Sequence, residues 1–326
     1  MKDYINRNNI FLVHVFLFQG LFICAQQNML PPVRAHHALV YDDVKKHIVL
    51  FGGSTPVDGG NSAIFLNDAW SFDGKWTYNV EAGDKRSGIG LAFDSKRKKI
   101  FSFGGYTGKN DCCSDLRVWE NNDWKKVSEI PGLAAAESGF VYDSQRDKLI
   151  AFGGSGGQRQ VNADTWEWDG KEWKKFEGAG PGGRQAFAMV YDEKRKKTIL
   201  FGGMGNNGPG SLFNDTWEFD GTQWKKISDD GPGARASAGF AYDSDKGLFI
   251  LFGGMTKDGF VNDTWSYDGK EWKKLSSEGP QKRAMGYLAY DKERKKIIMF
   301  GGRLGWPNDA NDTWEWDGSK WTEIKF

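Results

Sequence analysis

Arginine recurs along this chain at positions suited to binding carboxylates. Each recurring arginine stands seven residues before an aromatic residue that aspartate follows, as Arg34 stands before Tyr41 and Asp42. A guanidinium group binds a carboxylate through two parallel hydrogen bonds, so several around one opening would hold an acidic ligand. The alternative is that each arginine pairs with an aspartate of its own repeat and stabilises the fold. The arginines are Arg34, Arg86, Arg184, Arg235 and Arg283, and the candidate partners are Asp68, Asp164, Asp215, Asp263 and Asp312.

A histidine and a glutamate share one position of the repeat. His36 lies two residues after Arg34, and Glu137 lies two residues after Ala135, which replaces the arginine there. Imidazole and carboxylate groups commonly transfer protons in enzymes, so this pair is a candidate acid and base. The alternative is that His36 only fills space. His37 points to the opposite face of the same strand.

A third group of candidates lies in variable segments that follow Gly-Gly pairs. Trp306 stands in the segment from Arg303 to Asn308 and occupies no repeated position. An exposed indole beside amide and guanidinium groups is a typical platform for a sugar or a peptide. The alternative is that Trp306 covers the rim of the last repeat. The corresponding segments of the other repeats contribute Tyr106, Arg159, Asn206, Asn207, Lys257 and Phe260.

The elements that must position these residues are six copies of one unit. Each Gly-Gly pair follows an apolar segment and precedes a segment with two aromatic residues at period two, such as Trp70 and Phe72, before a closing Trp. This pattern predicts four short antiparallel strands per unit, with a tight hairpin at Asp-Gly. The first strand is expected to run from the arginine to the aromatic–Asp turn. The pairs begin at Gly52, Gly104, Gly153, Gly202, Gly253 and Gly301.

One such sheet cannot bury both of its faces, but six packed radially cover one another and close into a ring. The order arginine, strand, Gly-Gly, aromatic, Trp resembles the kelch repeat, in a secreted bacterial type of protein. The resemblance extends from Arg34 to Trp321. It implies an all-β fold, a six-bladed β-propeller of four-stranded antiparallel blades, with the first strands around a central channel. The blades are expected at residues 34–83, 84–132, 133–181, 182–232, 233–280 and 281–326, with the terminal blades packed directly together.

Two repeats depart from the pattern and break the chemical symmetry of the ring. Arg117 stands where the other repeats carry the first Trp of the third strand, and Asn121-Asn122 replaces Asp-Gly. The third repeat has Ala135 in place of the arginine. A specific ligand is expected to be recognised where the repeats differ.

Residues 1–25 differ from the rest and match a secretory signal peptide. Lys2 and Arg7 precede an apolar segment from Ile10 to Ile23, and Ala25 offers a cleavage site. The mature chain of residues 26–326 is then periplasmic or extracellular, and Cys24 leaves a lipoprotein as the alternative. Two adjacent cysteines, Cys112 and Cys113, remain after cleavage, so no disulfide framework is expected.

Composition excludes several classes of protein. Lys and Arg total 44 against 43 Asp and Glu, and the formal net charge of +1 argues against a nucleic-acid partner bound through bulk positive charge. Aromatic residues at 15% exclude a disordered chain. Beyond the leader, no apolar stretch reaches the length of a membrane span. A folded monomer without a membrane span after signal cleavage is expected.

These features favour an exported, non-catalytic binding module that recognises a protein or a glycan. The contact face would carry the arginines and the variable segments. The resemblance leaves one enzyme alternative, since some periplasmic six-bladed kelch proteins are sialic-acid mutarotases, and such a carbohydrate isomerase would use an arginine with His36 or Glu137. Kelch copper oxidases need a Cys crosslinked to Tyr and several His ligands, which the adjacent cysteines and scarce histidines do not match. No metal or cofactor is expected.

Overall fold

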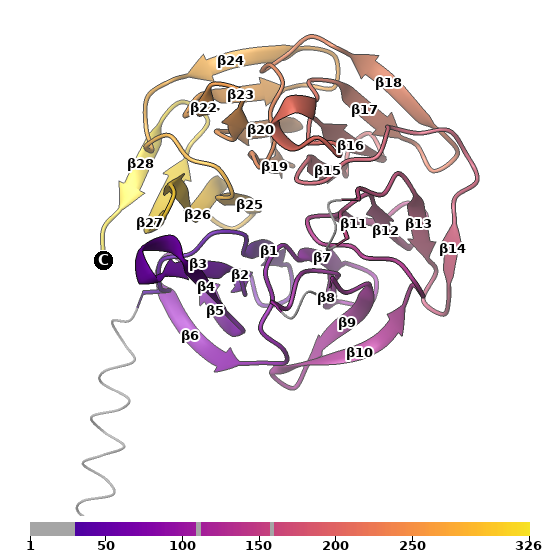
Figure 1. Ribbon diagram of the computed structural model, residues 1–326, viewed down its shortest axis with the longest axis horizontal. Helices are drawn as coiled ribbons and strands as arrows, with labels where there is room; N and C mark the ends of the chain where they lie inside the picture. Colours follow the sequence, from indigo (N-terminus) through magenta and orange to yellow (C-terminus); the bar gives the residue numbers. More distant parts are fainter. Residues whose placement is uncertain (1–29, 109–111, 157–159) are drawn as a thin grey trace, which may run out of the picture.

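The computed structural model describes residues 30–108, 112–156 and 160–326. Six four-stranded antiparallel sheets surround a central axis, and the described residues hold only two short 3-10 helices (Figure 1). This arrangement confirms the prediction of a six-bladed β-propeller. The predicted leader with Cys24 lies outside the described residues. Within those described, no helix is long and apolar enough to cross a bilayer.

Each blade takes its four strands in chain order, from the channel to the rim. Blades 1 and 2 contain β1 (Ala38–Asp42), β2 (His47–Phe51), β5 (Asp68–Phe72), β6 (Trp76–Glu81), β7 (Gly90–Asp94), β8 (Lys99–Phe103), β9 (Asp115–Glu120) and β10 (Asp123–Glu129). Blades 3 and 4 contain β11 (Gly139–Asp143), β12 (Lys148–Phe152), β13 (Thr165–Trp168), β14 (Trp173–Lys175), β15 (Ala188–Asp192), β16 (Lys197–Phe201), β17 (Thr216–Phe219) and β18 (Trp224–Ser228). Blades 5 and 6 contain β19 (Gly239–Asp243), β20 (Leu248–Phe252), β23 (Thr264–Tyr267), β24 (Trp272–Ser276), β25 (Tyr287–Asp291), β26 (Lys296–Gly305), β27 (Asn308–Trp316) and β28 (Trp321–Ile324).

The second strand of each blade is buried on both faces because a neighbouring sheet covers each face. In β2, Ile48 and Leu50 contact blade 6, whereas Val49 and Phe51 belong to a cluster shared with blade 2. Continuous apolar sequence is typical of strands covered on both sides. Six hydrophobic clusters result, one at each interface between blades, and the cluster at the interface of blades 6 and 1 closes the ring.

The Gly-Gly pairs join neighbouring blades through backbone hydrogen bonds. In blade 1, the N–H of Gly53 donates to the carbonyl of Arg86 in blade 2 at 2.8 Å, and Arg86 N–H donates back to Leu66 at 3.0 Å. The same pair of bonds occurs between blades 6 and 1, where Gly302 donates to Arg34 at 2.9 Å and Arg34 donates to Ala310 at 3.1 Å. The terminal blades therefore join by direct packing, without an exchanged strand.

The first strands start later than the sequence predicts. β1 begins at Ala38 rather than at Arg34, because His36 has a left-handed backbone with φ of 55° that interrupts the extended chain. One residue in each blade has this left-handed conformation at the equivalent position. From Gly88 to Met285, the backbone N–H of each such residue donates a hydrogen bond to the backbone carbonyl of the equivalent residue in the preceding blade, at 2.6–3.0 Å. We call these residues the inner belt. Its members are His36, Gly88, Glu137, Ala186, Ser237 and Met285.

Candidate functional site

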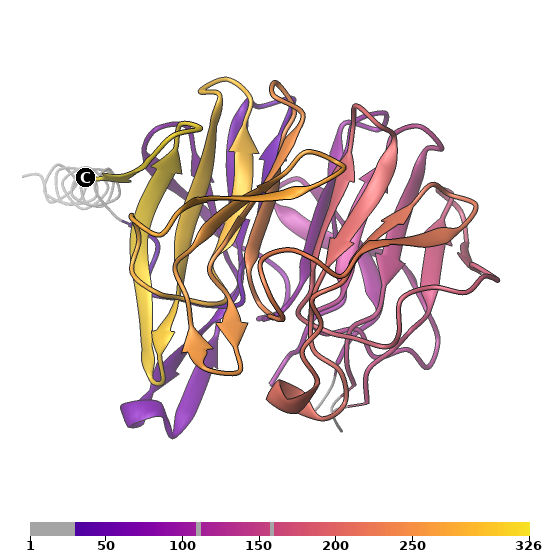
Figure 2. The ribbon, with the colours of Figure 1, turned by 90° about the horizontal axis from the view of Figure 1, so that it is seen from above.

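The connections between the second and third strands of the blades lie on one face of the disc, called the loop face here. Blade 1 carries the hairpin β3 (Ser54–Val57) and β4 (Ser62–Phe65) around the 3-10 helix η1 (Asp58–Gly60). Blade 4 carries η2 (Gly208–Ser211), and blade 5 carries β21 (Met255–Thr256) and β22 (Gly259–Phe260). In blade 6, β26 and β27 themselves extend into a long hairpin. Figure 2 shows η1, η2 and this hairpin at the same side of the disc.

The five arginines lie beneath this face and are engaged by aspartates of their own blades. Arg184 is 1% exposed, and its NH1 and NH2 atoms donate to the two Asp215 oxygens at 2.6 and 3.1 Å. NH1 also donates to the Gly202 carbonyl at 2.9 Å. The geometry thus favours the ion-pair alternative over a ring of free guanidinium groups at the channel mouth. The same arrangement joins Arg34 to Asp68, Arg86 to Asp115, Arg235 to Asp263 and Arg283 to Asp312.

In every blade the aspartate at the start of the third strand has a hydrogen-bonding or charged partner, but blades 2 and 3 supply different residues for it. In four blades the indole N–H of the third-strand Trp donates to the paired aspartate, as Trp217 donates to Asp215 at 2.7 Å. In blade 2, the guanidinium of Arg117 replaces the indole and contacts Asp115 at 2.5 Å. In blade 3, which lacks the arginine, Asp164 contacts the exposed Lys175 instead, at 2.9 Å.

Trp306 is the most exposed of the large apolar side chains described, at 59%. The Arg303 guanidinium lies 4.6 Å from the centre of its ring and is itself bound by the Asp309 carboxylate at 2.8 and 3.2 Å. Gly60 of η1 lies so close that a Cβ atom there would fall 2.5 Å from the indole nitrogen. Trp306 is therefore exposed to solvent yet held in place from two sides.

The other predicted loop residues are distributed around the same face rather than gathered at Trp306. Tyr106 packs edge-on against Phe65 of β4, with ring centres 5.3 Å apart. Asn206 accepts a hydrogen bond from the Val161 backbone at 2.9 Å and so joins blades 4 and 3. Phe260 is half-buried in β22. Arg159 lies outside the described residues.

The predicted acid–base pair is brought together at the inner belt. His36 Nδ1 lies 2.8 Å from Glu137 Oε1, although blade 2 separates the two blades. The contact spans Gly88, where a Cβ atom would lie 3.0 Å from the Glu137 Cγ. Burial alone would raise the pKa of Glu137, but His36 and the charge of Arg303 outweigh it and hold that pKa below its ordinary value. Glu137 is therefore a carboxylate at neutral pH.

His37 lies on the other side of the chain, at the interface where the ring closes. It is 0% exposed, and its ring stands edge-on to Tyr287 and Phe300 of blade 6 at 5.4 and 5.6 Å. Neither ring nitrogen has a hydrogen-bond partner among the described residues, although the nearby Phe300 backbone slightly favours the charged form. Burial, then the charges of Arg34 and His36, lower the pKa of His37 well below its ordinary value.

Acid is expected to weaken this closing interface through His37. In the unfolded chain the His37 imidazole takes up a proton near pH 6.5, whereas in the folded chain it stays neutral at that pH. The free energy of unfolding therefore falls as pH drops below 6.5, by at most about 1.4 kcal/mol per pH unit. The equivalent position in blade 4 is Phe187, so His37→Phe is the matched variant. Urea denaturation at pH 7.5 and 5.5 should show a smaller loss for His37→Phe than for the natural protein. Equal losses would contradict this role of His37.

Several residues of this region carry no signal that singles them out in the sequence. Phe65 and the neighbouring Ile64, which is 46% exposed, lie in the β3–β4 hairpin of blade 1, whose sequence does not follow the repeat. Tyr287 lines the channel beside the belt. Gly88 offers one clue, because it is the only glycine at a position that otherwise holds His, Glu, Ala, Ser or Met.

The remaining chemistry of the described residues is sparse. Cys112 and Cys113 are half-buried, and burial raises the pKa of the Cys113 thiol. Within the parts of the chain that the structure describes, no group of three His, Cys, Asp or Glu side chains is placed to hold a metal ion.

The blades, the buried Arg–Asp pairs and the Gly-Gly bonds define a β-propeller built from one repeated unit. The family model described as the KLHDC2/KLHL20/DRC7 Kelch-repeats domain matches residues 167–326, the second half of the ring. No curated protein matches the chain. The matched half of the ring is similar to that kelch-repeat domain, and the Gly-Gly pair and the closing Trp recur in all six blades.

Proposed function

We propose that this propeller is an exported binding module that recognises a partner protein through its loop face, with Trp306 at the centre of contact. Kelch propellers generally bind proteins. The exposed and fixed indole of Trp306 is the observation that carries the proposal. Export is inferred from the leader-like residues 1–25.

The physical argument is that Trp306 meets the requirements of an anchor residue. A tryptophan side chain offers a large contact area with few rotatable bonds, and binding hot spots are enriched in this residue type. Arg303 and Gly60 already restrict the Trp306 ring, so little conformational entropy remains to be lost on binding. The half-exposed Ile64 adds a second apolar group on the adjoining hairpin. A glycan stacked on the indole is the alternative ligand.

A quantitative affinity capture from the extracellular fraction of the source organism tests the proposal. The natural protein should enrich at least one protein that Trp306→Ala enriches about tenfold less, as expected for a hot spot worth at least about 1.4 kcal/mol. Phe326→Ala is the matched control, because Phe326 is 56% exposed but contacts Phe72 at the third-strand end away from the loop face.

Two outcomes of this comparison would contradict a protein partner. The first is that the natural protein, Trp306→Ala and Phe326→Ala all enrich the same captured proteins to the same extent. The second is that a glycan array shows the only binding that depends on Trp306, which would identify the ligand as a glycan.

A second candidate is the carbohydrate isomerase, favoured by the 2.8 Å contact between His36 and Glu137. Against it, the five arginines that would hold a sugar carboxylate are occupied by aspartates, and Arg303 is bound by Asp309. Exchange NMR of the anomers of sialic acid distinguishes the two functions. Faster exchange that Glu137→Gln abolishes would support the isomerase.

A further inference from the structure

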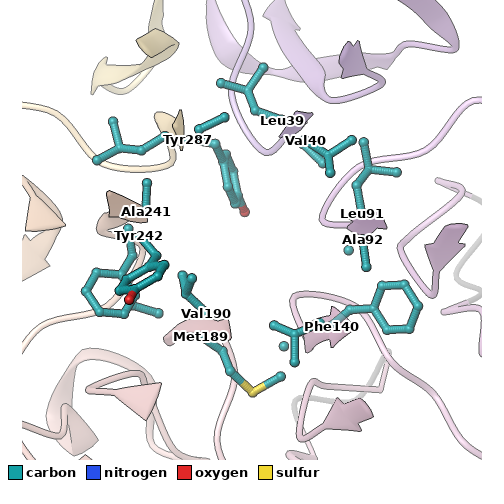
Figure 3. A pocket seen from close by; sticks show the side chains of 18 of the residues that line it. Leu39, Val40, Leu91, Ala92, Phe140, Met189, Val190, Ala241, Tyr242 and Tyr287 are labelled. Carbon is teal, nitrogen blue, oxygen red and sulfur yellow. The ribbon is translucent and has the colours of Figure 1, made fainter. Parts of the chain in front are cut away.

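The first strands of the six blades enclose a channel with a volume of about 330 Å³. The side chains at its middle are mostly apolar and come from different blades, as Figure 3 shows for Leu39, Leu91, Met189 and Tyr287. Polar residues line its two ends: Glu137 and Ser237 at the inner belt, and Glu193 and Lys292 at the opposite face. The channel therefore has an apolar body between polar ends.

Water is a poor occupant of such a body. A water molecule needs two to four polar partners to be held in a cavity, and the leucine, valine, alanine and methionine side chains here offer none. A volume of this size is at the lower end of the range of small-molecule sites in proteins. An apolar molecule with on the order of ten non-hydrogen atoms would displace that water at a gain in free energy.

The belt end of the channel carries hydrogen-bond acceptors and a negative charge. Glu137 lines the channel, and His36 contacts its Oε1, whereas within the described residues no partner engages Oε2. The Tyr287 hydroxyl points into the opening (Figure 3). Burial and the charge of Glu137 raise the pKa of Tyr287, so the phenol remains protonated. Arg303 is near enough to act on Glu137, but Asp309 binds its guanidinium group.

A ligand that fits this end must bring a hydrogen-bond donor, and a positive charge fits it best. A carboxylate that is largely removed from water gains most from a charged donor at hydrogen-bond distance. An ammonium group between Oε2 and the Tyr287 hydroxyl would also lie beside an aromatic ring, which attracts cations. An anionic head group would be repelled by Glu137, and a purely apolar molecule would bring no donor to Glu137 Oε2.

We propose that the central channel binds a small primary amine with an apolar body, its ammonium group held by Glu137 and Tyr287. The apolar part occupies the space among Leu39, Leu91 and Met189. This site is separate from the Trp306 surface, because it lies on the axis of the ring and is reached through the channel. It gives the module a small-molecule ligand in addition to a macromolecular partner.

Three probes of one shape test the head group. The probes are 2-phenylethylamine, 2-phenylethanol and phenylacetate, with binding to the full mature chain followed by ligand-observed NMR and calorimetry. We expect saturable binding of the amine, at least about tenfold tighter than the alcohol, with the acid weaker than both. Equal affinities for amine and alcohol, or no saturable binding of any probe, would overturn the proposal.

Variants locate the site. Glu137→Gln keeps the shape of the side chain and should weaken amine binding about tenfold or more while changing alcohol binding less than about twofold. Leu91→Trp fills the channel and should abolish binding of both, with Leu39→Trp as the second choice if the first does not fold by circular dichroism. Phe326→Ala should bind the amine as the natural protein does, because Phe326 lies outside the channel and away from the loop face. Unchanged amine binding in Glu137→Gln, or in a folded channel-filling variant, would overturn the assignment.

Discussion

Replacing Asp215 with alanine is expected to destabilise the protein by about 3–5 kcal/mol. The substitution leaves Arg184 buried at 1% exposure with only carbonyl acceptors, at Gly202 and Gly182. It also removes the acceptor of the Trp217 indole N–H. A buried guanidinium group without its carboxylate loses its counter-charge but remains largely removed from water, which accounts for the expected size of the effect.

The measurement is the free energy of unfolding from urea denaturation, with fluorescence and circular dichroism transitions required to coincide. Asp258→Ala is the control, because Asp258 and Lys257 form an ion pair at 2.8 Å with both side chains about four-fifths exposed. That variant should stay within about 0.5 kcal/mol of the natural protein. The double variant Arg184→Met with Asp215→Leu should be more stable than Asp215→Ala, since no unpaired charge remains.

The same pair has a pH signature. Burial would raise the pKa of Asp215, but the hydrogen bonds and charge of Arg184 and the Trp217 indole outweigh burial and lower that pKa. The stabilisation is therefore present above the ordinary carboxyl pKa near 4 and is lost as pH falls through the lower folded value.

For the Asp215→Ala variant itself, a decrease of less than about 1 kcal/mol in the free energy of unfolding would show that buried Arg184 does not depend on its aspartate.

The number of blades follows directly from the sequence because the repeated residues have fixed structural roles. A Gly-Gly pair such as Gly52 and Gly53 must turn with positive φ, and Trp70 with Phe72 must share one face of a strand. Such constraints are local and recur in every blade. The position of the inner belt is different, since His36, Glu137, Ala186, Ser237 and Met285 share a backbone conformation but no chemical character. Contacts between blades select that conformation, so sequence alone places the start of the first strands too early.

The candidate site could be predicted less well than the fold. An arginine has the same type and spacing whether it binds a ligand or an aspartate, and only the distances between Arg184 and Asp215 decide. The partner of Arg86 is Asp115, which the repeat pattern obscures because Arg117 stands where other blades have Trp. The position of the Trp306 ring depends on Arg303 of the same segment and on Gly60 of blade 1, which is distant in the sequence.

The interfaces between blades also differ in their hydrogen bonds, and the repeat pattern alone does not show which interface lacks one. The closing Trp of four blades donates its indole N–H to a threonine of the preceding blade, as Trp321 donates to Thr264 at 2.9 Å. Ala69 replaces that threonine in blade 1, and the indole N–H of Trp124 is buried without a partner among the described residues. The interface of blades 1 and 2 therefore lacks a hydrogen bond that most interfaces possess.

Substitution of Gly104 by alanine is expected to destabilise the protein by about 3–5 kcal/mol, from two additive causes. Gly104 has a φ of 70°, which costs an alanine about 1–2 kcal/mol. In addition, a Cβ atom would lie 2.2 Å from the carbonyl oxygen of Ala135 in the next blade. That carbonyl cannot easily retreat, because the Gly105 N–H donates to it at 3.1 Å and so joins blades 2 and 3.

Gly59→Ala separates the two causes. Gly59 has nearly the same φ, 66°, but a Cβ atom there meets nothing within 4 Å. It should therefore lose only the conformational part, about 1–2 kcal/mol, as measured by urea denaturation under identical conditions. The difference between the two variants measures the steric cost of separating two blades at the Gly-Gly bond. If both glycines cost the same, close approach at this bond would not be what requires glycine, and left-handed geometry alone would account for the Gly-Gly pairs.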